Sequence, residues 1–138
     1  MSNRIKLNQR GLSLVELMIV VTIIGILMTI TYPSYLSYMQ DTRRGVAEAD
    51  LMELSQWMER NYTVSGRYTN VSNAAPALPF DKSPKDGAVG HYGLGIIAIT
   101  ANSYVLTATP VPGSAQSTDP CGVIRVDQTG NRVFVGGC

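Results

Sequence analysis

The sequence predicts an α+β protein in which one long helix near the amino terminus packs, by its second half, on a four-stranded antiparallel sheet. Three observations predict this fold. No charged residue occurs from Leu17 to Gln40, apolar residues then recur at helical spacing as far as Tyr62, and four short strand-like runs follow His91. The helix is therefore expected to be hydrophobic in its first half and amphipathic in its second.

The first part of the chain has the properties of a membrane anchor. Arg4, Lys6 and Arg10 precede Gly11, and at about 1.5 Å per helical residue the apolar run from Leu17 to Gln40 can span about 30 Å of hydrocarbon. The basic flank predicts a cytoplasmic amino terminus, so the rest of the chain is exported. The run continues through Thr29 to Pro33 without an Ala-x-Ala, which argues against conventional signal cleavage. A plain uncleaved signal-anchor explains everything except the positions of Gly11 and Glu16.

The pattern along the chain divides it into five segments. We expect a basic leader over residues 1–11, a hydrophobic helix over 12–40, its amphipathic continuation over 41–62, a breaker-rich connecting loop over 63–90, and the sheet with a carboxyl-terminal disulfide loop over 91–138. The helical stripe consists of Ala47, Leu51, Leu54, Met58 and Tyr62. The predicted strands are Tyr92 to Thr100, Ser103 to Pro110, Gly122 to Asp127, and Asn131 to Val135. Their short connections predict antiparallel hairpins.

The two cysteines, Cys121 and Cys138, are predicted to form a disulfide. Both lie beyond the anchor, in the exported part of the chain, where an even cysteine count favours oxidation. The bond would hold the carboxyl-terminal tail against the start of the third predicted strand. The alternative is a pair of unpaired thiols in a cytosolic protein.

Glu16 is a lone carboxylate at the start of the apolar run. An ionisable group in a membrane segment costs about 2.5–3.5 kcal/mol on insertion scales, so such residues usually have a partner or a function. A local explanation also exists, because Ser13-x-x-Glu16 matches a capping box at a helix start. The capping explanation requires the helix to begin near Ser13.

Helix-weakening residues gather in the same apolar run. Pro33 lacks an amide proton and so deprives the Thr29 carbonyl of its helical partner, while Gly25 lowers helix propensity. We therefore expect local flexibility around Gly25 and Pro33. Small residues could equally form a helix-packing face.

Composition argues against several functions. Without residues 1–11 the chain keeps eight basic and ten acidic residues, so we expect no nucleic-acid partner, because nucleic-acid affinity rests on clustered Lys and Arg. His91 is the only histidine, and no second imidazole or cysteine cluster offers a metal shell. No phosphate loop, nucleophile elbow or His-Glu-x-x-His pattern occurs, so we expect neither an enzyme nor a cofactor.

The amino-terminal motif resembles that of the type IV pilins. The resemblance rests on Gly11 before an apolar residue, on Glu16, and on the segments Leu17–Val21, Ile23–Leu27 and Tyr32–Tyr35. The segment from Asn61 to Tyr68 and the terminal cysteine pair are similar to those of PilE-like minor pilins of type IVa pili. The resemblance implies the pilin fold.

The resemblance also implies roles for individual residues. A prepilin peptidase would cut between Gly11 and Leu12 and methylate the new amine of Leu12, where the family usually has Phe. Glu16 would meet the positive amine of a neighbouring subunit and set axial register. The span from Gly25 to Pro33 would be the part of the helix that loosens on assembly.

The implied function is that of a type IV pilus subunit, and the resemblance favours a minor pilin that primes or joins assembly and so supports twitching motility, adhesion or surface sensing. Its partners would be other major and minor pilins through their amino-terminal helices, the prepilin peptidase, and the inner-membrane assembly machinery. The subunit would wait in the bacterial inner membrane with its globule in the periplasm, and then enter an extracellular pilus. A major pilin, a type II secretion pseudopilin and an uncleaved membrane-anchored binding protein are the alternatives.

Overall fold

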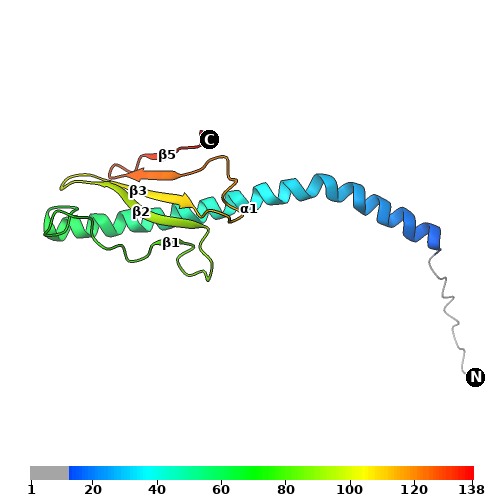
Figure 1. Ribbon diagram of the computed structural model, residues 1–138, viewed down its shortest axis with the longest axis horizontal. Coiled ribbons are helices and arrows are strands. Elements are labelled where there is room, and N and C mark those ends of the chain that lie inside the picture. Colours follow the sequence, from blue (N-terminus) through cyan, green and yellow to red (C-terminus); the bar gives the residue numbers. More distant parts are fainter. Residues whose placement is uncertain (1–12) are drawn as a thin grey trace, which may run out of the picture. The chain divides into compact units, whose positions relative to one another are not determined.

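The computed structural model describes residues 13–138, and these fall into two units that meet between Ser37 and Tyr38 (Figure 1). The helix α1 runs from Leu14 to Ser65 and contributes to both units. The predictions that concern Met1 to Leu12, among them Gly11 and Leu12, lie outside the described residues.

The described part of the first unit is helical, and every residue from Ser13 to Ser37 is exposed. By length and composition, α1 includes a stretch that could cross a membrane. Because all its side chains are exposed, packing within the chain contributes nothing to this part of the helix. Its stability must come from its own backbone bonds and from an apolar environment.

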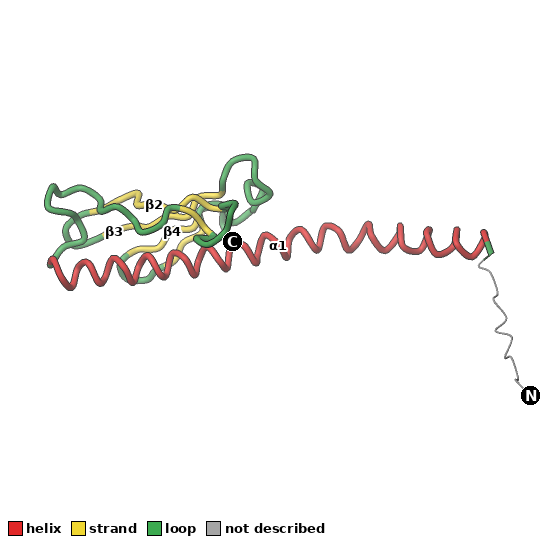
Figure 2. Tube along the Cα trace, turned by 90° about the horizontal axis from the view of Figure 1, so that it is seen from below, coloured by secondary structure: helices red, strands yellow, loops and turns green. Residues whose placement is uncertain are grey.

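The second unit packs residues 38–65 of α1 against an antiparallel sheet of strand order β1-β2-β3-β4-β5 (Figure 2). The strands are β1 (Lys82–Ser83), β2 (Tyr92–Ile99), β3 (Tyr104–Pro110), β4 (Ile124–Asp127) and β5 (Arg132–Phe134). All four pairs of neighbouring strands are antiparallel. The predicted α+β fold is therefore confirmed.

The core lies between the helix and the sheet. Ala47, Leu51, Leu54 and Met58 are fully buried, and they recur at helical spacing on one face of α1. The sheet supplies the other side of the core through Tyr92, Leu94, Tyr104, Leu106, Ala108, Ile124 and Val126. Burying a side chain such as Leu51 contributes about 1.5–3 kcal/mol, so this interface is the main source of stability for the second unit.

The sheet has five strands, and the prediction of four is wrong in this detail. The additional strand, β1, lies in the segment predicted as a loop and pairs with β2 through Lys82 opposite Gly93 and Ser83 opposite Tyr92. It contains two residues and is followed directly by Pro84. A strand this short shows no alternation of apolar and polar residues, so periodicity cannot reveal it.

The helix continues to Ser65, three residues beyond the predicted end at Tyr62. The Thr63 hydroxyl donates to the Glu59 carbonyl at 2.9 Å, and the Ser65 hydroxyl donates to the Asn61 carbonyl at 2.8 Å. Gly66 then ends the helix with a φ of 68°, in the left-handed conformation that glycine adopts most readily.

The carboxyl-terminal tail is held by the predicted disulfide between Cys121 and Cys138, whose Cα atoms are 5.1 Å apart. Next to it, the Gly136 amide donates to the Cys121 carbonyl at 2.9 Å. A Cβ atom on Gly136 would lie 2.0 Å from the Pro120 carbonyl oxygen. Only glycine therefore allows the tail to pass this close to residues 120 and 121.

Candidate functional site

The exposed apolar surface of α1 is the first candidate site. Many of its side chains are more than half exposed, including Leu14, Val15, Leu17, Met18, Ile19, Val21, Ile23, Ile26, Leu27 and Met28. A continuous apolar surface of this kind marks contact with a membrane or with other proteins. Glu16 is the only charged residue on the described helix before Asp41, so its carboxylate is isolated on an apolar surface.

The helix begins directly before Glu16. The Leu17 amide donates to the Ser13 carbonyl at 3.1 Å, which places Ser13 at the capping position. Within residues 13–138, no hydrogen bond joins the Ser13 and Glu16 side chains to the backbone at this turn. The capping box that the sequence allows is thus absent from the described part of the helix, where the Glu16 carboxylate also accepts no hydrogen bond from residues 13–138.

Threonine hydroxyl groups along the apolar helix donate hydrogen bonds to backbone carbonyls of the preceding turn. The Thr22 hydroxyl donates to the Met18 carbonyl at 2.7 Å, and the Thr31 hydroxyl donates to the Leu27 carbonyl at 2.9 Å. A hydroxyl bonded in this way can enter an apolar environment at little cost. Among the polar side chains of this surface, Glu16 therefore stands apart because its charge cannot be satisfied so simply.

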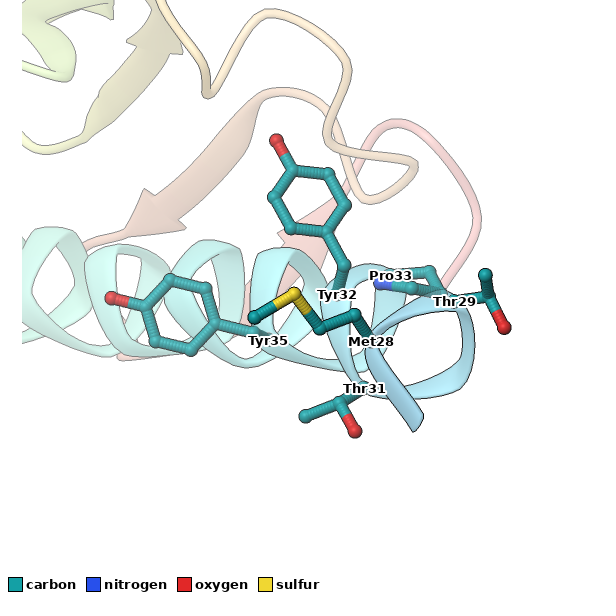
Figure 3. Close-up of a pocket in the computed structure, with 6 residues that line it drawn as sticks. All are labelled: Met28, Thr29, Thr31, Tyr32, Pro33 and Tyr35. Atoms are coloured by element: carbon teal, nitrogen blue, oxygen red, sulfur yellow. The ribbon is translucent and has the colours of Figure 1, made fainter. Parts of the chain in front are cut away.

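Pro33 lies inside α1, and the helix continues through it and through Gly25. A shallow hollow surrounds Pro33 and is lined by Met28, Thr29, Thr31, Tyr32, Pro33 and Tyr35 (Figure 3). In Figure 3 the two tyrosine rings project from the helix with the Met28 side chain between them. The helix is unbroken in this structure, so the flexibility expected at Gly25 and Pro33 stays a prediction.

A buried carboxylate forms the second candidate site, where α1 meets the loop that follows β3. The Asp119 side chain is fully buried and accepts hydrogen bonds from the Arg44 guanidinium, the Tyr92 hydroxyl at 2.8 Å and the Cys121 amide at 3.1 Å. Arg44 also bonds Asp41, at 3.0 Å. Asp119 thus joins the helix, the sheet and the disulfide.

Gln116 extends this network along the helix. Its amide nitrogen, fully buried, lies 2.8 Å from both the Tyr92 hydroxyl and an Asp119 oxygen, and 3.2 Å from the Gln40 carbonyl. The Gln40 side chain in turn donates to the Ala115 carbonyl at 3.1 Å and to the Thr118 hydroxyl at 3.0 Å. The loop therefore holds the helix on both its backbone and its side chain at Gln40.

Burial and hydrogen bonding shift the pKa values in this network in opposite ways. Burial raises the pKa of Asp119, but the hydrogen bonds from Arg44, Tyr92 and the Cys121 amide outweigh it, so the pKa is lowered overall. Burial, followed by the hydrogen bond to Asp119, raises the pKa of Tyr92 to about 12. The hydrogen bond to Asp119 raises the pKa of Arg44. At neutral pH the carboxylate is therefore ionised and the phenol is protonated.

These shifts predict how the stability of the second unit depends on pH. Because the pKa of Asp119 is lowered on folding, its contribution is present above the unfolded value of about 3.9 and is lost as the pH falls through the folded value. Because the pKa of Tyr92 is raised to about 12, its contribution is present below about 10 and is lost as the pH rises toward 12. Denaturant unfolding at several pH values gives the free energy of unfolding of wild type and of Asp119→Asn. The difference between the two free energies should shrink below about pH 4. A difference that does not change with pH would contradict the lowered pKa of Asp119.

Some residues of the two candidate sites can be found from the sequence, and others cannot. Sequence reasoning singled out Glu16, Gly25 and Pro33, which lie on the exposed helix, and the cysteines, which are bonded. It missed the network, for which the sequence offers one weak signal, the position of Asp119 two residues before a cysteine. Among residues 13–138 no group of three or more His, Cys, Asp or Glu side chains could hold a metal ion.

A long helix with an apolar first half, a second half packed on an antiparallel sheet, and a disulfide-bonded tail define the class of type IV pilins. Two family models match the chain: "Prokaryotic N-terminal methylation motif" over residues 6–32, and "Type IV minor pilin ComP, DNA uptake sequence receptor" over residues 33–125. The second match spans most of the chain, which therefore belongs to the ComP family of type IV minor pilins. The methylation motif places it among the pilins that a prepilin peptidase processes.

Individual proteins and solved structures are also similar to this chain. The "Type IV major pilin protein PilA" of Myxococcus xanthus (strain DK1622) is 29% identical over 119 residues, which cover 86% of this chain and 50% of that protein. The chain thus spans half the length of this curated relative. The non-core minor pilin PilV of Neisseria meningitidis has a similar fold, with a TM-score of 0.52, 20% identity, and coverage of 70% of this chain and 87% of PilV. A type IV pilin from Shewanella oneidensis aligns with a TM-score of 0.47 at 25% identity, over 72% of this chain and 96% of that one.

Proposed function

We propose that this protein is a minor subunit of a type IV pilus, which waits in the membrane and then joins or primes a filament through its apolar helix. The observation that carries the proposal is the uncovered apolar surface of α1, on which Glu16 is the only charge before Asp41. The match to the methylation motif over residues 6–32 covers the same part of the chain. Such a surface is covered by lipid before assembly and by other pilin helices afterwards.

Processing and register follow from the chemistry of the helix start. Cleavage between Gly11 and Leu12, with methylation of the Leu12 amine, creates a cation next to the first turn of the helix. The Glu16 carboxylate is costly in an apolar environment unless it is paired. In our proposal a neighbouring subunit's amine supplies the partner, so that Glu16 sets axial register more than it adds net stability.

The proposed location follows from charge and oxidation state. Arg4, Lys6 and Arg10 favour a cytoplasmic amino terminus, and the disulfide between Cys121 and Cys138 fits an oxidising compartment for the globule. We therefore place the subunit in the bacterial inner membrane with a periplasmic globule before assembly, and in an extracellular pilus afterwards. The inner-membrane assembly machinery would be its partner at that step.

The globule would act as a surface in the filament and not as an enzyme. Twitching motility, adhesion or surface sensing would then be properties of the pilus that contains it. A minor role is favoured by the family match over residues 33–125, and a major role would instead require this chain to be the most abundant subunit of sheared filaments. Quantitative mass spectrometry of sheared pili separates the two roles.

Replacing Gly11 by valine tests the proposal at its first step. We expect Gly11→Val to leave the leader attached and to abolish incorporation into pili, because the branched side chain blocks the peptide bond that the peptidase must cut. Intact-mass measurement of the membrane fraction reads out the cleavage, and a shearing assay reads out incorporation. Normal cleavage of the Gly11→Val chain, or a wild-type chain that keeps residues 1–11, would contradict the pilin proposal.

DNA is the second candidate partner, because the description of the matching family names a DNA uptake sequence receptor. The charge of this chain does not favour DNA binding. Eight basic residues face ten acidic ones after Gly11, and Arg44, Lys85 and Arg132 are already engaged in ion pairs. We therefore keep the prediction of no nucleic-acid partner. A mobility-shift titration of the processed protein with duplex DNA at physiological salt should show no retardation at micromolar protein; a stable complex would overturn it.

A further inference from the structure

We infer that the loop over residues 111–122 acts as a clamp that keeps local unwinding of α1 from passing Gln40 into the globule. Gln40, Gln116 and Asp119 are then positioning residues: they fix where the mobile helix ends and the rigid globule begins. This assignment does not depend on the proposed function, because it concerns the stability of one helix in the isolated subunit.

The helix has no tertiary support before the clamp. All residues from Ser13 to Tyr38 are exposed, and burial begins at Met39 and Gln40. Pro33 cannot donate a backbone hydrogen bond, so the Thr29 carbonyl lacks its helical partner. Opening of a helix starts where bonds are missing and contacts are few. Opening that starts near Pro33 reaches the globule first at Gln40.

The bonds at Gln40 are suited to stop such opening. The Gln40 carbonyl accepts a hydrogen bond from the side-chain amide of Gln116 at 3.2 Å. The Gln40 side chain donates to the Ala115 carbonyl and the Thr118 hydroxyl. One turn further on, Arg44 is held by the fully buried Asp119. These bonds come from outside the helix, so they remain when the preceding helical bonds break. Unwinding past Gln40 would have to break them as well.

The clamp is itself held in place. The Cys121 amide donates to Asp119 at 3.1 Å, and Cys121 is bonded to Cys138. The Tyr92 hydroxyl of β2 donates to the same carboxylate at 2.8 Å. The loop is therefore fixed to the sheet and to the disulfide, and it holds the helix to both.

Amide hydrogen exchange of the full processed protein in detergent micelles tests the clamp. In wild type we expect faster exchange around Pro33, where the helical bond is missing, than from Gln40 onward. Gln116→Leu keeps the size of the side chain but removes its donors, and Gln40→Ala removes the partly exposed side chain. Each variant should accelerate exchange of residues 40–46 by about tenfold or more, relative to amides of β3.

Lys85→Gln is the matched control, because it breaks an ion pair with Glu53 elsewhere on the globule and should leave residues 40–46 unchanged. If Gln116→Leu does not fold, Gln40→Ala tests the clamp alone, because Gln40 is not part of the core. Unchanged exchange of residues 40–46 in a folded variant would overturn the clamp. Equal acceleration of residues 40–46 and β3 would overturn it too, because the residues would then have only a general structural role.

Discussion

We expect Asp119→Ala to lower the free energy of unfolding of the globule by about 3–5 kcal/mol, the usual cost of removing one partner from a buried ion pair. The Asp119 side chain is fully buried, and its partner Arg44 is 16% exposed. The substitution leaves the Arg44 charge without its main partner and deprives the Tyr92 hydroxyl and the Cys121 amide of their acceptor. Thermal unfolding followed by circular dichroism should show a midpoint lower by more than about 10 °C.

Lys85→Gln serves as the control for this prediction. The Lys85–Glu53 pair is partly exposed, with 33% and 47% of the two side chains accessible, so its loss should change the stability of the globule little. If Asp119→Ala and Lys85→Gln unfold at midpoints within about 2 °C of each other, the buried network does not make the larger contribution to the stability of the globule.

The helix and its core face could be predicted from the sequence because each depends on neighbours close in the chain. Ala47, Leu51, Leu54 and Met58 recur every three or four residues, and that spacing puts them on one face of any helix. Strand β3 begins with a similarly local pattern, in which buried and partly exposed residues take turns. The two-residue strand β1 could not be predicted, because its pairing depends on β2, about ten residues further along the chain.

The two candidate sites also differ in whether they depend on neighbours close in the chain. Glu16 is visible in the sequence because its neighbours along the chain are all apolar. The Asp119 network is not visible, because Arg44 and Asp119 lie 75 residues apart. On a helical wheel Arg44 lies at the edge of the apolar stripe, at the same angle as Tyr62, but that position does not identify Asp119, which pairs with it in the folded globule. Only the tertiary fold brings these charges together.

Glu16→Ala should leave processing intact and reduce incorporation into pili by at least about tenfold, which corresponds to about 1.4 kcal/mol in assembly. In our proposal the filament loses the ion pair that fixes the axial position of each subunit, while the apolar helix stays as hydrophobic as before. Intact mass of the membrane form checks that the leader is removed and the amine methylated. A shearing assay, normalised to the membrane pool, measures incorporation.

Glu16→Gln separates the two roles that the sequence allows for this residue. Glutamine can replace glutamate in a capping box, but it carries no charge to pair with an amine. Within residues 13–138 no capping bond joins Ser13 and Glu16, whereas the Ser13 carbonyl accepts the first helical bond from the Leu17 amide. Glu16→Gln is therefore expected to fail in assembly as Glu16→Ala does. Wild-type incorporation of Glu16→Gln with failure of Glu16→Ala would show that a hydrogen bond, and not a charge pair, is what assembly requires of Glu16.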